Sequence, residues 1–367
     1  MKYFIWECKL LTAIFLVSFA IALQIIDHFY YRSSFPNLAL IPKNASIREI
    51  RRYLARTGPK KFDKLFAVFP FIWSYLYIIA AILVSGLTNS IFVKTILILF
   101  VTGRFRTLQE AGHFAVHGAL CKNINFALWL ANLLYQFPTF MPEASVRRDT
   151  HVRRHHNSVN MPHDPDLLEL EDKRFRPGIS SVSFWTGVFY PITPAGIKDR
   201  LIECASYIWH DRKNPVHLSS RIATVAVIVA LFAHFGMYEE MFLYYIVPVL
   251  ITYPLFYWIA HISLHRWYKE VSDDLDYDTR ELTLGRPTEF PGIVGLIVRN
   301  NIFPLGDSYH LAHSLFPTVR WNHLPRVDKY LKATFPTYSQ DITHGLFISA
   351  RSGQSILAGL KETMVGH

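Results

Sequence analysis

The chain contains 367 residues, of which 51% are hydrophobic and 15% are aromatic, and it carries a formal net charge of +10. Because the apolar residues fall in long runs instead of short amphipathic stretches, we expect a membrane-embedded protein rather than a soluble one. The three cysteines, Cys8, Cys121 and Cys204, are far apart, which argues against a thiolate zinc site, a fused rubredoxin-like module or a disulfide framework.

Five apolar segments are candidates for membrane spans, namely residues 10–26, 66–87, 91–101, 221–235 and 241–260. The third segment is short, but a helix-compatible stretch extends it to residue 119, so the whole helix is long enough to cross a hydrocarbon core of ~30 Å. Only three residues join the second segment to the third, and about five join the fourth to the fifth. We therefore predict two tight helical hairpins behind an N-terminal apolar helix.

The first apolar segment ends in Ala20, Ile21 and Ala22, a pattern that resembles a signal-peptide cleavage site. Cleavage after export would place the basic stretch 48–64 on the outer side of the membrane, against the positive-inside rule. We therefore predict an uncleaved span or an interfacial helix. Two shorter apolar stretches, at 126–140 and 183–194, contain Pro or polar residues and are predicted to be interfacial or re-entrant helices.

Positive charge gathers in residues 48–64 and 147–154, beside the predicted spans. Neither predicted hairpin tip contains Lys or Arg, whereas the long connections 27–65, 141–220 and 266–367 contain nearly all of them. By the positive-inside rule, these connections of a multi-pass membrane protein face the cytoplasm. The basic stretches lack a nucleic-acid-binding motif, so we expect no nucleic-acid partner.

Nine of the seventeen histidines form four short groups, each with at least two residues at the spacing of one helix face. The groups are His113 with His117, His151 with His155 and His156, His261 with His265, and His310 with His313. The predicted topology places all four at the cytoplasmic side, which favours one shared site. Because a tetrahedral zinc takes about four ligands, eight or nine imidazoles indicate two metals, and iron, copper and zinc all suit such ligands.

The order HxxxH, HxxxHH and HxxH resembles the three histidine boxes of membrane fatty acid desaturases and the related alkane hydroxylases. The surrounding residues resemble the boxes as well: QEAGHFAVHGAL the first, HHNSVNMPHDPD the second and YHLAHSLFPTVRWNHLP the third. The resemblance extends over residues 65 to 330. It implies an all-α integral membrane fold, with four core transmembrane helices in two hairpins and a cytoplasmic helical cap that holds a di-iron site with an active site facing the cytoplasm.

On this basis we predict three regions. Residues 1–64 form the N-terminal apolar helix and basic segment, residues 65–335 form the desaturase-like membrane domain, and residues 336–367 form a C-terminal cytoplasmic tail. The resemblance also implies the residues that bind metal and serve catalysis: His113, His117, His151, His155, His156, His265, His310 and His313, with His261 as a direct or water-mediated metal contact.

The implied reaction is the O₂-dependent oxidation of an unactivated carbon in a fatty acyl or lipid chain, and desaturation is our first choice. Such chemistry is beyond side-chain acid–base catalysis, so a metal and O₂ must supply it. Hydroxylation or oxidative decarboxylation of a fatty acid or alkane is the alternative on the same scaffold. A divalent-metal transporter is a remote alternative, because transport should place the histidines near the bilayer midplane. An inactive relative is another.

One residue departs from the family pattern. Where the third box normally carries a final histidine, this chain has Ser314, so we expect one metal to have an open position or to borrow His261 or His323. Carboxylates near the boxes are expected to orient the imidazoles through their outer N–H groups, although a surface or capping role is equally open for each. These candidates are Glu110, Asp149, Asp164, Asp166 and Asp307.

Electrons for the two iron ions must come from another protein. The chain has no cysteine cluster, no GxGxxG fingerprint and no recognisable haem-binding domain. The basic residues Arg147, Arg148, Arg153 and Arg154 are candidates for docking an acidic ferredoxin, rubredoxin or cytochrome b5, and equally for marking topology or binding an acyl headgroup phosphate. Membrane lipid is the remaining expected partner.

Overall fold

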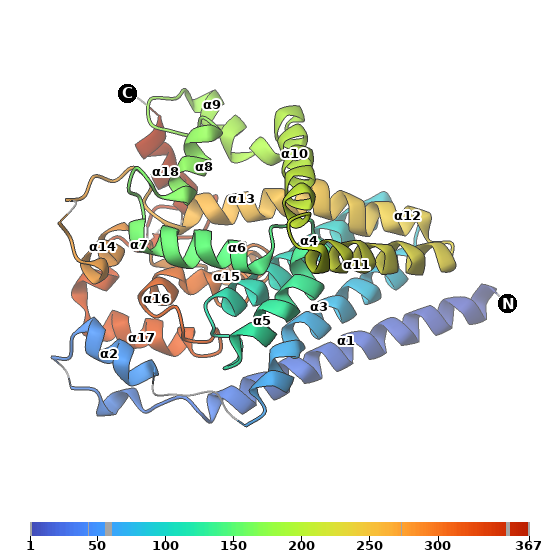
Figure 1. The fold of residues 1–367 in the computed structure, drawn as a ribbon, viewed down its shortest axis with the longest axis horizontal. Helices are drawn as coiled ribbons and strands as arrows, with labels where there is room; N and C mark the ends of the chain where they lie inside the picture. Colours follow the sequence, from blue (N-terminus) through green and yellow to red (C-terminus); the bar gives the residue numbers. More distant parts are fainter. Residues whose placement is uncertain (1, 43, 56–60, 273, 350–352, 366–367) are drawn as a thin grey trace.

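The computed structural model describes residues 2–42, 44–55, 61–272, 274–349 and 353–365 (Figure 1). Residues 56–60 of the basic stretch 48–64 lie outside this description. The described chain is mostly helical, as predicted, and its two short strands, β1 (Thr288–Glu289) and β2 (Thr343–His344), pair in parallel. Long helices extend toward one end of the molecule, and short helices gather at the other end (Figure 1).

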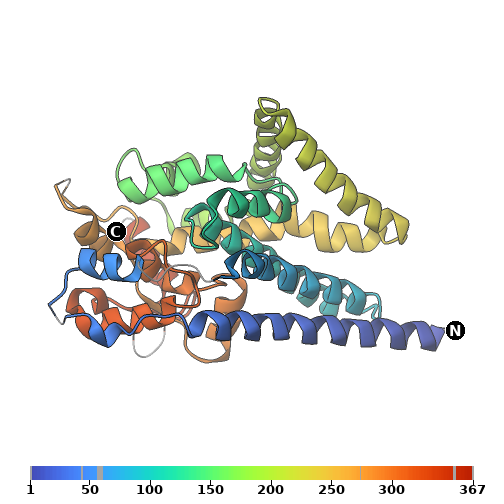
Figure 2. The same ribbon diagram turned by 60° about the horizontal axis from the view of Figure 1, so that its bottom comes forward.

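Helix α1 (Lys2–Arg32) packs along α3 (Asp63–Ser85), and the two lie side by side in both views (Figure 2). The buried carboxylate of Asp27 lies 2.9 Å from the guanidinium of Arg320 and fastens the end of α1 to the region of the third histidine group. The first apolar segment is therefore an integrated helix of the fold.

Four helices are long and apolar enough to cross a membrane: Trp6–Arg32, Asp63–Ser85, Pro215–His234 and Tyr238–Leu264. They correspond to four of the five predicted segments: each begins earlier than predicted, two end later, and the helices Asp63–Ser85 and Pro215–His234 end one or two residues earlier. The third predicted segment forms a continuous helix, α4 (Ile91–Val116), but its composition does not qualify it as a span, because it contains charged residues such as Arg104, Arg106 and Glu110.

Helix α4 passes through the centre of the protein, and every residue from Val101 to Val116 is buried. Gly103 allows the close approach of α15 (Gly292–Asn301), because a Cβ atom at this position would lie 2.1 Å from the side-chain oxygen of Asn301. The charged second half of α4 thus faces protein groups, which is where charges in an apolar segment are tolerated.

The fourth and fifth segments form α11 (Pro215–His234) and the longer helical run from α12 (Tyr238–Met241) to α13 (Tyr253–Leu264). Two π-helical turns, η5 (Phe242–Ile246) and η6 (Pro248–Thr252), interrupt this run. The second begins at a proline, which lacks the N–H that an α-helical bond requires. Figure 2 shows α11 slanting away from α13, and most of its side chains are not buried in the described structure.

The stretches 126–140 and 183–194 form short helices, as predicted, whereas their position relative to a bilayer remains a prediction. Other short elements connect the long helices and surround the histidines. The elements not yet named are η1 (Leu38–Leu40), α2 (Ile47–Ala55), α5 (Ile124–Ala131), η2 (Asn132–Gln136), α6 (Ala144–Arg147), η3 (Arg148–His155), α7 (His156–Ser158), α8 (Pro165–Asp172), α9 (Ser181–Val188), η4 (Tyr190–Ile192), α10 (Pro194–Asp211), α14 (Tyr277–Leu284), η7 (Asp307–Tyr309), α16 (His310–Leu315), α17 (Leu324–Thr334), η8 (Pro336–Ser339) and α18 (Ile356–Met364).

The C-terminal region packs into the fold where the structure describes it. Helix α18 contacts α13 and α9, and its side chains Leu357, Leu360 and Met364 are buried. The described part of residues 336–365 is therefore attached to the helical core, while the three predicted region limits remain predictions.

Candidate metal centre

Eight histidines from four distant parts of the chain meet inside the protein. Helix α4 carries His113 and is followed directly by His117, and the turns η3 and α7 carry His151, His155 and His156. His265 directly follows α13, and α16 carries His310 and His313. Each of these side chains is between 1% and 9% exposed. The histidine spacing therefore produces a single buried cluster, as the sequence predicts.

The first half of the cluster surrounds His113. Its Nε2 atom lies 3.0 Å from Nε2 of His117, 2.9 Å from that of His151 and 3.2 Å from that of His313. Ligand atoms of His113, His117, His156 and His313 all lie within 4.8 Å of one another. Four imidazoles at this separation are a suitable ligand set for one transition-metal ion.

The second half of the cluster extends from His151 toward α16. Ligand atoms of His151, His155 and Asp166 lie within 4.8 Å of one another. The His155 ring lies 5.2 Å from that of His265, whose Nε2 is 3.3 Å from Nε2 of His310. The ligand atoms of His151, His155 and Asp166 thus form a second group that could hold a metal ion.

Three of the clustered histidines are held in the neutral form that metal binding needs. Burial, together with the neighbouring imidazoles, holds the pKa of His151, His156 and His313 well below the usual range. A neutral imidazole can donate a ring nitrogen to a metal. Both ring nitrogens of the buried His156 lack a hydrogen-bond partner among the described residues. The donor set therefore fits a pair of imidazole-bound metal ions.

Asp164 and Asp166 support His155. Nδ1 of His155 lies 2.8 Å from the fully buried Asp164 and 3.4 Å from Asp166. Burial lowers the pKa of His155, but the two carboxylates outweigh this effect and raise it to about 9. A carboxylate at the outer nitrogen fixes the ring orientation and makes the inner nitrogen a stronger ligand.

A chain of charged side chains connects the two halves of the cluster. The Nδ1 atom of His113 lies 2.9 Å from Glu110, and Glu110 lies 3.0 Å from Arg106. Arg106 lies 2.9 Å from Asp307, which is 3.5 Å from Nδ1 of His310. The sequence analysis missed Arg106, although an arginine within an apolar segment is itself a signal of a functional or paired position.

Two predicted site residues lie elsewhere. Asp149 is half-exposed and forms ion pairs with Arg153 and Arg154, because its side chain points to the surface. His261 lies outside the imidazole cluster: it stacks on Tyr257, with ring centroids 5.7 Å apart, and its Nε2 is 3.3 Å from the Asp166 carbonyl. The predicted contact of Asp149 with the imidazoles is therefore absent from the described structure.

The four arginines considered for donor docking divide into two pairs. Arg153 and Arg154 have side chains that are 72% and 57% exposed. Arg147 lines a cavity, and Arg148 donates a hydrogen bond to the carbonyl of Val116. Of these four arginines, only Arg153 and Arg154 have largely exposed side chains in the described structure.

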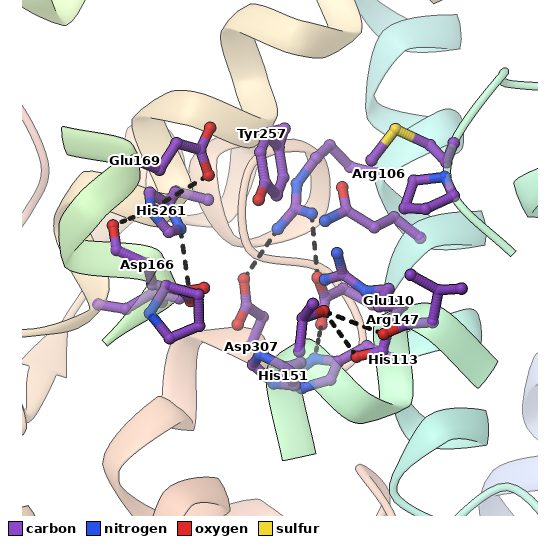
Figure 3. Close-up of a pocket in the computed structure, with 18 of the residues that line it drawn as sticks. Arg106, Glu110, His113, Arg147, His151, Asp166, Glu169, Tyr257, His261 and Asp307 are labelled. Carbon is purple, nitrogen blue, oxygen red and sulfur yellow. Dashed lines mark hydrogen bonds and ion pairs between the residues drawn. The ribbon is translucent and has the colours of Figure 1, made fainter. Parts of the chain in front are cut away.

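A cavity of about 350 Å³ reaches the histidine cluster at His113, His151 and His310. Figure 3 shows its charged lining, with Arg106 and Arg147 on one side and Asp166 and Glu169 on the other. Further lining residues are Glu203, Tyr207 and Tyr257. The space beside the candidate metals is therefore polar as well as apolar.

Comparison with known proteins agrees with this geometry. The model of the fatty acid desaturase family matches residues 89–345, a range that contains all four histidine groups. The chain is also similar to a dihydrorhizobitoxine desaturase from Bradyrhizobium elkanii, with 24% identity over 341 residues that cover 86% of this chain and 89% of that protein. The chain belongs to the fatty acid desaturase family, and it is an oxidoreductase by that membership.

Proposed function

We propose that the chain is a multi-pass membrane enzyme that uses two iron ions and O₂ to desaturate a fatty acyl or lipid chain. The observation that carries this proposal is the buried cluster of eight imidazoles, which divides into two adjacent ligand groups. Iron and O₂ supply the oxidising power to remove hydrogen from an unactivated carbon, which amino-acid side chains cannot do.

The protein positions the ligands and keeps water away from them. In this proposal, His113, His117, His156 and His313 hold one iron, and His151, His155, His265 and His310 hold the other. Glu110 and Asp164 accept from the outer ring nitrogens of His113 and His155, which fixes the tautomers of these two rings. Asp307 lies 3.5 Å from Nδ1 of His310 without a hydrogen bond between these two described residues. The cavity that reaches His113, His151 and His310 would hold the carbon to be oxidised.

Hydroxylation and oxidative decarboxylation remain alternatives on the same scaffold. Desaturation removes two hydrogens and leaves the carbon count unchanged, hydroxylation adds one oxygen, and decarboxylation shortens a free acid by one carbon. Mass spectrometry of the products therefore separates the three reactions.

A small polar substrate is a second candidate, and the charged lining of the cavity favours it. A methylene chain gains nothing from Arg147, Glu169 and Glu203, whereas a molecule with charged or hydroxyl groups would pair with them. The similar protein from Bradyrhizobium elkanii is named as a dihydrorhizobitoxine desaturase, not as a desaturase of an acyl lipid.

We further propose that the long basic connections and the histidine cluster face the cytoplasm, with α3 and α4 as one hairpin and α11 and α13 as the other. An external electron donor of the ferredoxin, rubredoxin or cytochrome b5 type would dock from that side. The exposed guanidinium groups of Arg153 and Arg154 support such docking.

The test is to express the chain in a bacterial host and to profile both lipids and polar metabolites, with a His155→Ala variant as the control. A new unsaturated lipid that depends on His155 would support the first substrate class. A new unsaturated polar metabolite would support the second. A product profile identical to that of the control would contradict the proposed activity, provided that the iron-loaded protein and a donor are present.

A further inference from the structure

The place of the missing box-three histidine is completely buried. Ser314 is 1% exposed, directly after His313, and its hydroxyl forms no hydrogen bond of normal geometry with a described residue. The two histidines considered as substitutes point elsewhere. His261 stacks on the aromatic rings of α13, and the His323 ring lies 4.8 Å from that of Phe35.

A carboxylate faces this place instead. Glu281 on α14 is 0% exposed, and neither of its oxygens forms a hydrogen bond of normal geometry with a described residue. Helix α14 packs on α16, which carries Ser314 and His310, and the Tyr277 hydroxyl of α14 contacts the Ser314 carbonyl. The carboxylate is close enough to Ser314, His155 and His310 to interact with them electrostatically. An uncompensated buried carboxylate costs several kcal/mol, so either a cation or a bound proton must stabilise it.

The surrounding fold holds Glu281 in this orientation. Asp276 caps the start of α14 by accepting from the backbone N–H groups of Asp278 and Thr279. The Tyr277 hydroxyl donates to the Ser314 carbonyl at 2.6 Å, which connects α14 to α16. At the other end of α14, the backbone of Gly285 pairs with that of His265. Helix α14 is thus fastened on both sides of Glu281 to segments that carry metal-ligand candidates.

From this arrangement we propose that Glu281 supplies a carboxylate ligand to the metal held by His155, His265 and His310, in the place that a box-three imidazole would fill. This inference rests on the proposed two-metal site. A divalent cation would neutralise the buried carboxylate, and the carboxylate would complete a ligand set that Ser314 leaves short. Carboxylate and imidazole together are a common ligand combination for non-haem iron.

The proposal makes the two metals chemically different. The first has only imidazoles in its proposed ligand set, His113, His117, His156 and His313. The second gains an anionic oxygen ligand, which favours a harder metal ion in a higher oxidation state. Two distinct iron signals are therefore expected in the Mössbauer spectrum of the ⁵⁷Fe-loaded protein.

The experiment compares the wild type with Glu281→Gln and with the double variant Glu281→Gln/Ser314→His, which restores the imidazole. Glu362→Gln on the exposed face of α18 is the control. Iron per chain is measured against free Fe²⁺, together with the Mössbauer spectrum and the melting temperature. We expect Glu281→Gln to weaken one of the two sites by at least about tenfold and to alter one spectral component, and the double variant to recover the second iron.

The outcomes separate this inference from the proposed function. Two irons in Glu281→Gln, with unchanged affinity and spectrum, would overturn the ligand role and leave the two-metal site intact. A wild type without iron would overturn the proposed function itself. If Glu281→Gln fails to fold, infrared difference spectra of the wild type decide. Loss of a protonated carboxyl band on metal loading supports the ligand role, provided that the double variant lacks this band. Persistence of the band in the metal-loaded wild type overturns the ligand role.

Discussion

The guanidinium of Arg106 lies 2.9 Å from the carboxylate of Asp307, a residue 201 positions further along the chain. The same guanidinium lies 3.0 Å from Glu110. Because Glu110 contacts His113 and Asp307 lies beside His310, one buried arginine connects the supports of both metal groups. This connection suggests that the two proposed metal sites are coupled in stability.

Replacing Arg106 with methionine should therefore destabilise the fold and both metal groups together. The substitution leaves two buried carboxylates without their cation, a change that typically costs about 3–5 kcal/mol. The measurement is the melting temperature of the metal-free protein in detergent, followed by iron content. Arg153→Met is the matched control, because it removes an exposed ion pair with Asp149 and should cost less than about 1 kcal/mol. Equal melting temperatures for the two variants would contradict the connecting role of Arg106.

Asp164 and Asp149 form a second matched pair, since both are aspartates near the second histidine box. Asp164→Asn removes the buried negative charge 2.8 Å from His155 and should weaken metal binding by about 10–100-fold. Asp149→Asn changes only an exposed pair with arginines and should leave metal affinity unchanged. The measurement is a titration with Fe²⁺ or Co²⁺, monitored by absorbance. The role of Asp164 is refuted if the two variants bind metal equally well.

His265 and His261 are one helical turn apart but differ in their surroundings. Nε2 of His265 lies 3.3 Å from that of His310, whereas His261 lies against aromatic rings and beside Asp166. We expect His265→Ala to lose about one metal ion per chain, because imidazole ligands are not readily replaced by water. His261→Ala should retain both ions and change substrate binding instead, because His261 lines the cavity. Metal loss in His261→Ala would place this residue among the ligands after all.

Reversing the charge of Arg153 and Arg154 should raise the KM for an acidic electron donor without changing iron content. Both side chains are exposed, and charges at the rim of an interface act mainly on the rate of association. The effect should diminish at high ionic strength, because salt screens exposed charges. Reversal of Arg212 and Lys213, both exposed on the chain after α10, is the control. Identical donor kinetics for the two double variants would exclude docking at Arg153 and Arg154.

The sequence predicts the parts of this protein that depend on local spacing. Pairs such as His113 and His117 share a helix face, and the apolar runs form the long helices, so both the local histidine pairs and the helical fold follow from periodicity. Contacts between distant segments are not encoded locally. Nothing near Glu281 marks it as different from a surface glutamate, and only the packing of α14 on α16 brings it to Ser314.

The aspartates of the second box illustrate the same limit. Asp149 and Asp164 are both within a few residues of a histidine, and spacing does not tell which one turns inward. The structure shows that Asp164 begins α8 as its N-terminal cap and is thereby held against His155, whereas Asp149 lies on the outer side of a π-helical turn. The difference depends on the three-dimensional course of residues 148–166.

The central claim is that imidazoles from distant parts of the chain hold two irons, and metal analysis of the purified protein tests it most directly. After anaerobic reconstitution with Fe²⁺, the wild type should contain about two irons per chain, because its eight imidazoles exceed the needs of one ion. His113→Ala, which removes the ring central to the first group, should reduce this value to about one or less. An iron content of the wild type well below one per chain would contradict the account. The account would also be contradicted if His113→Ala left the iron content unchanged.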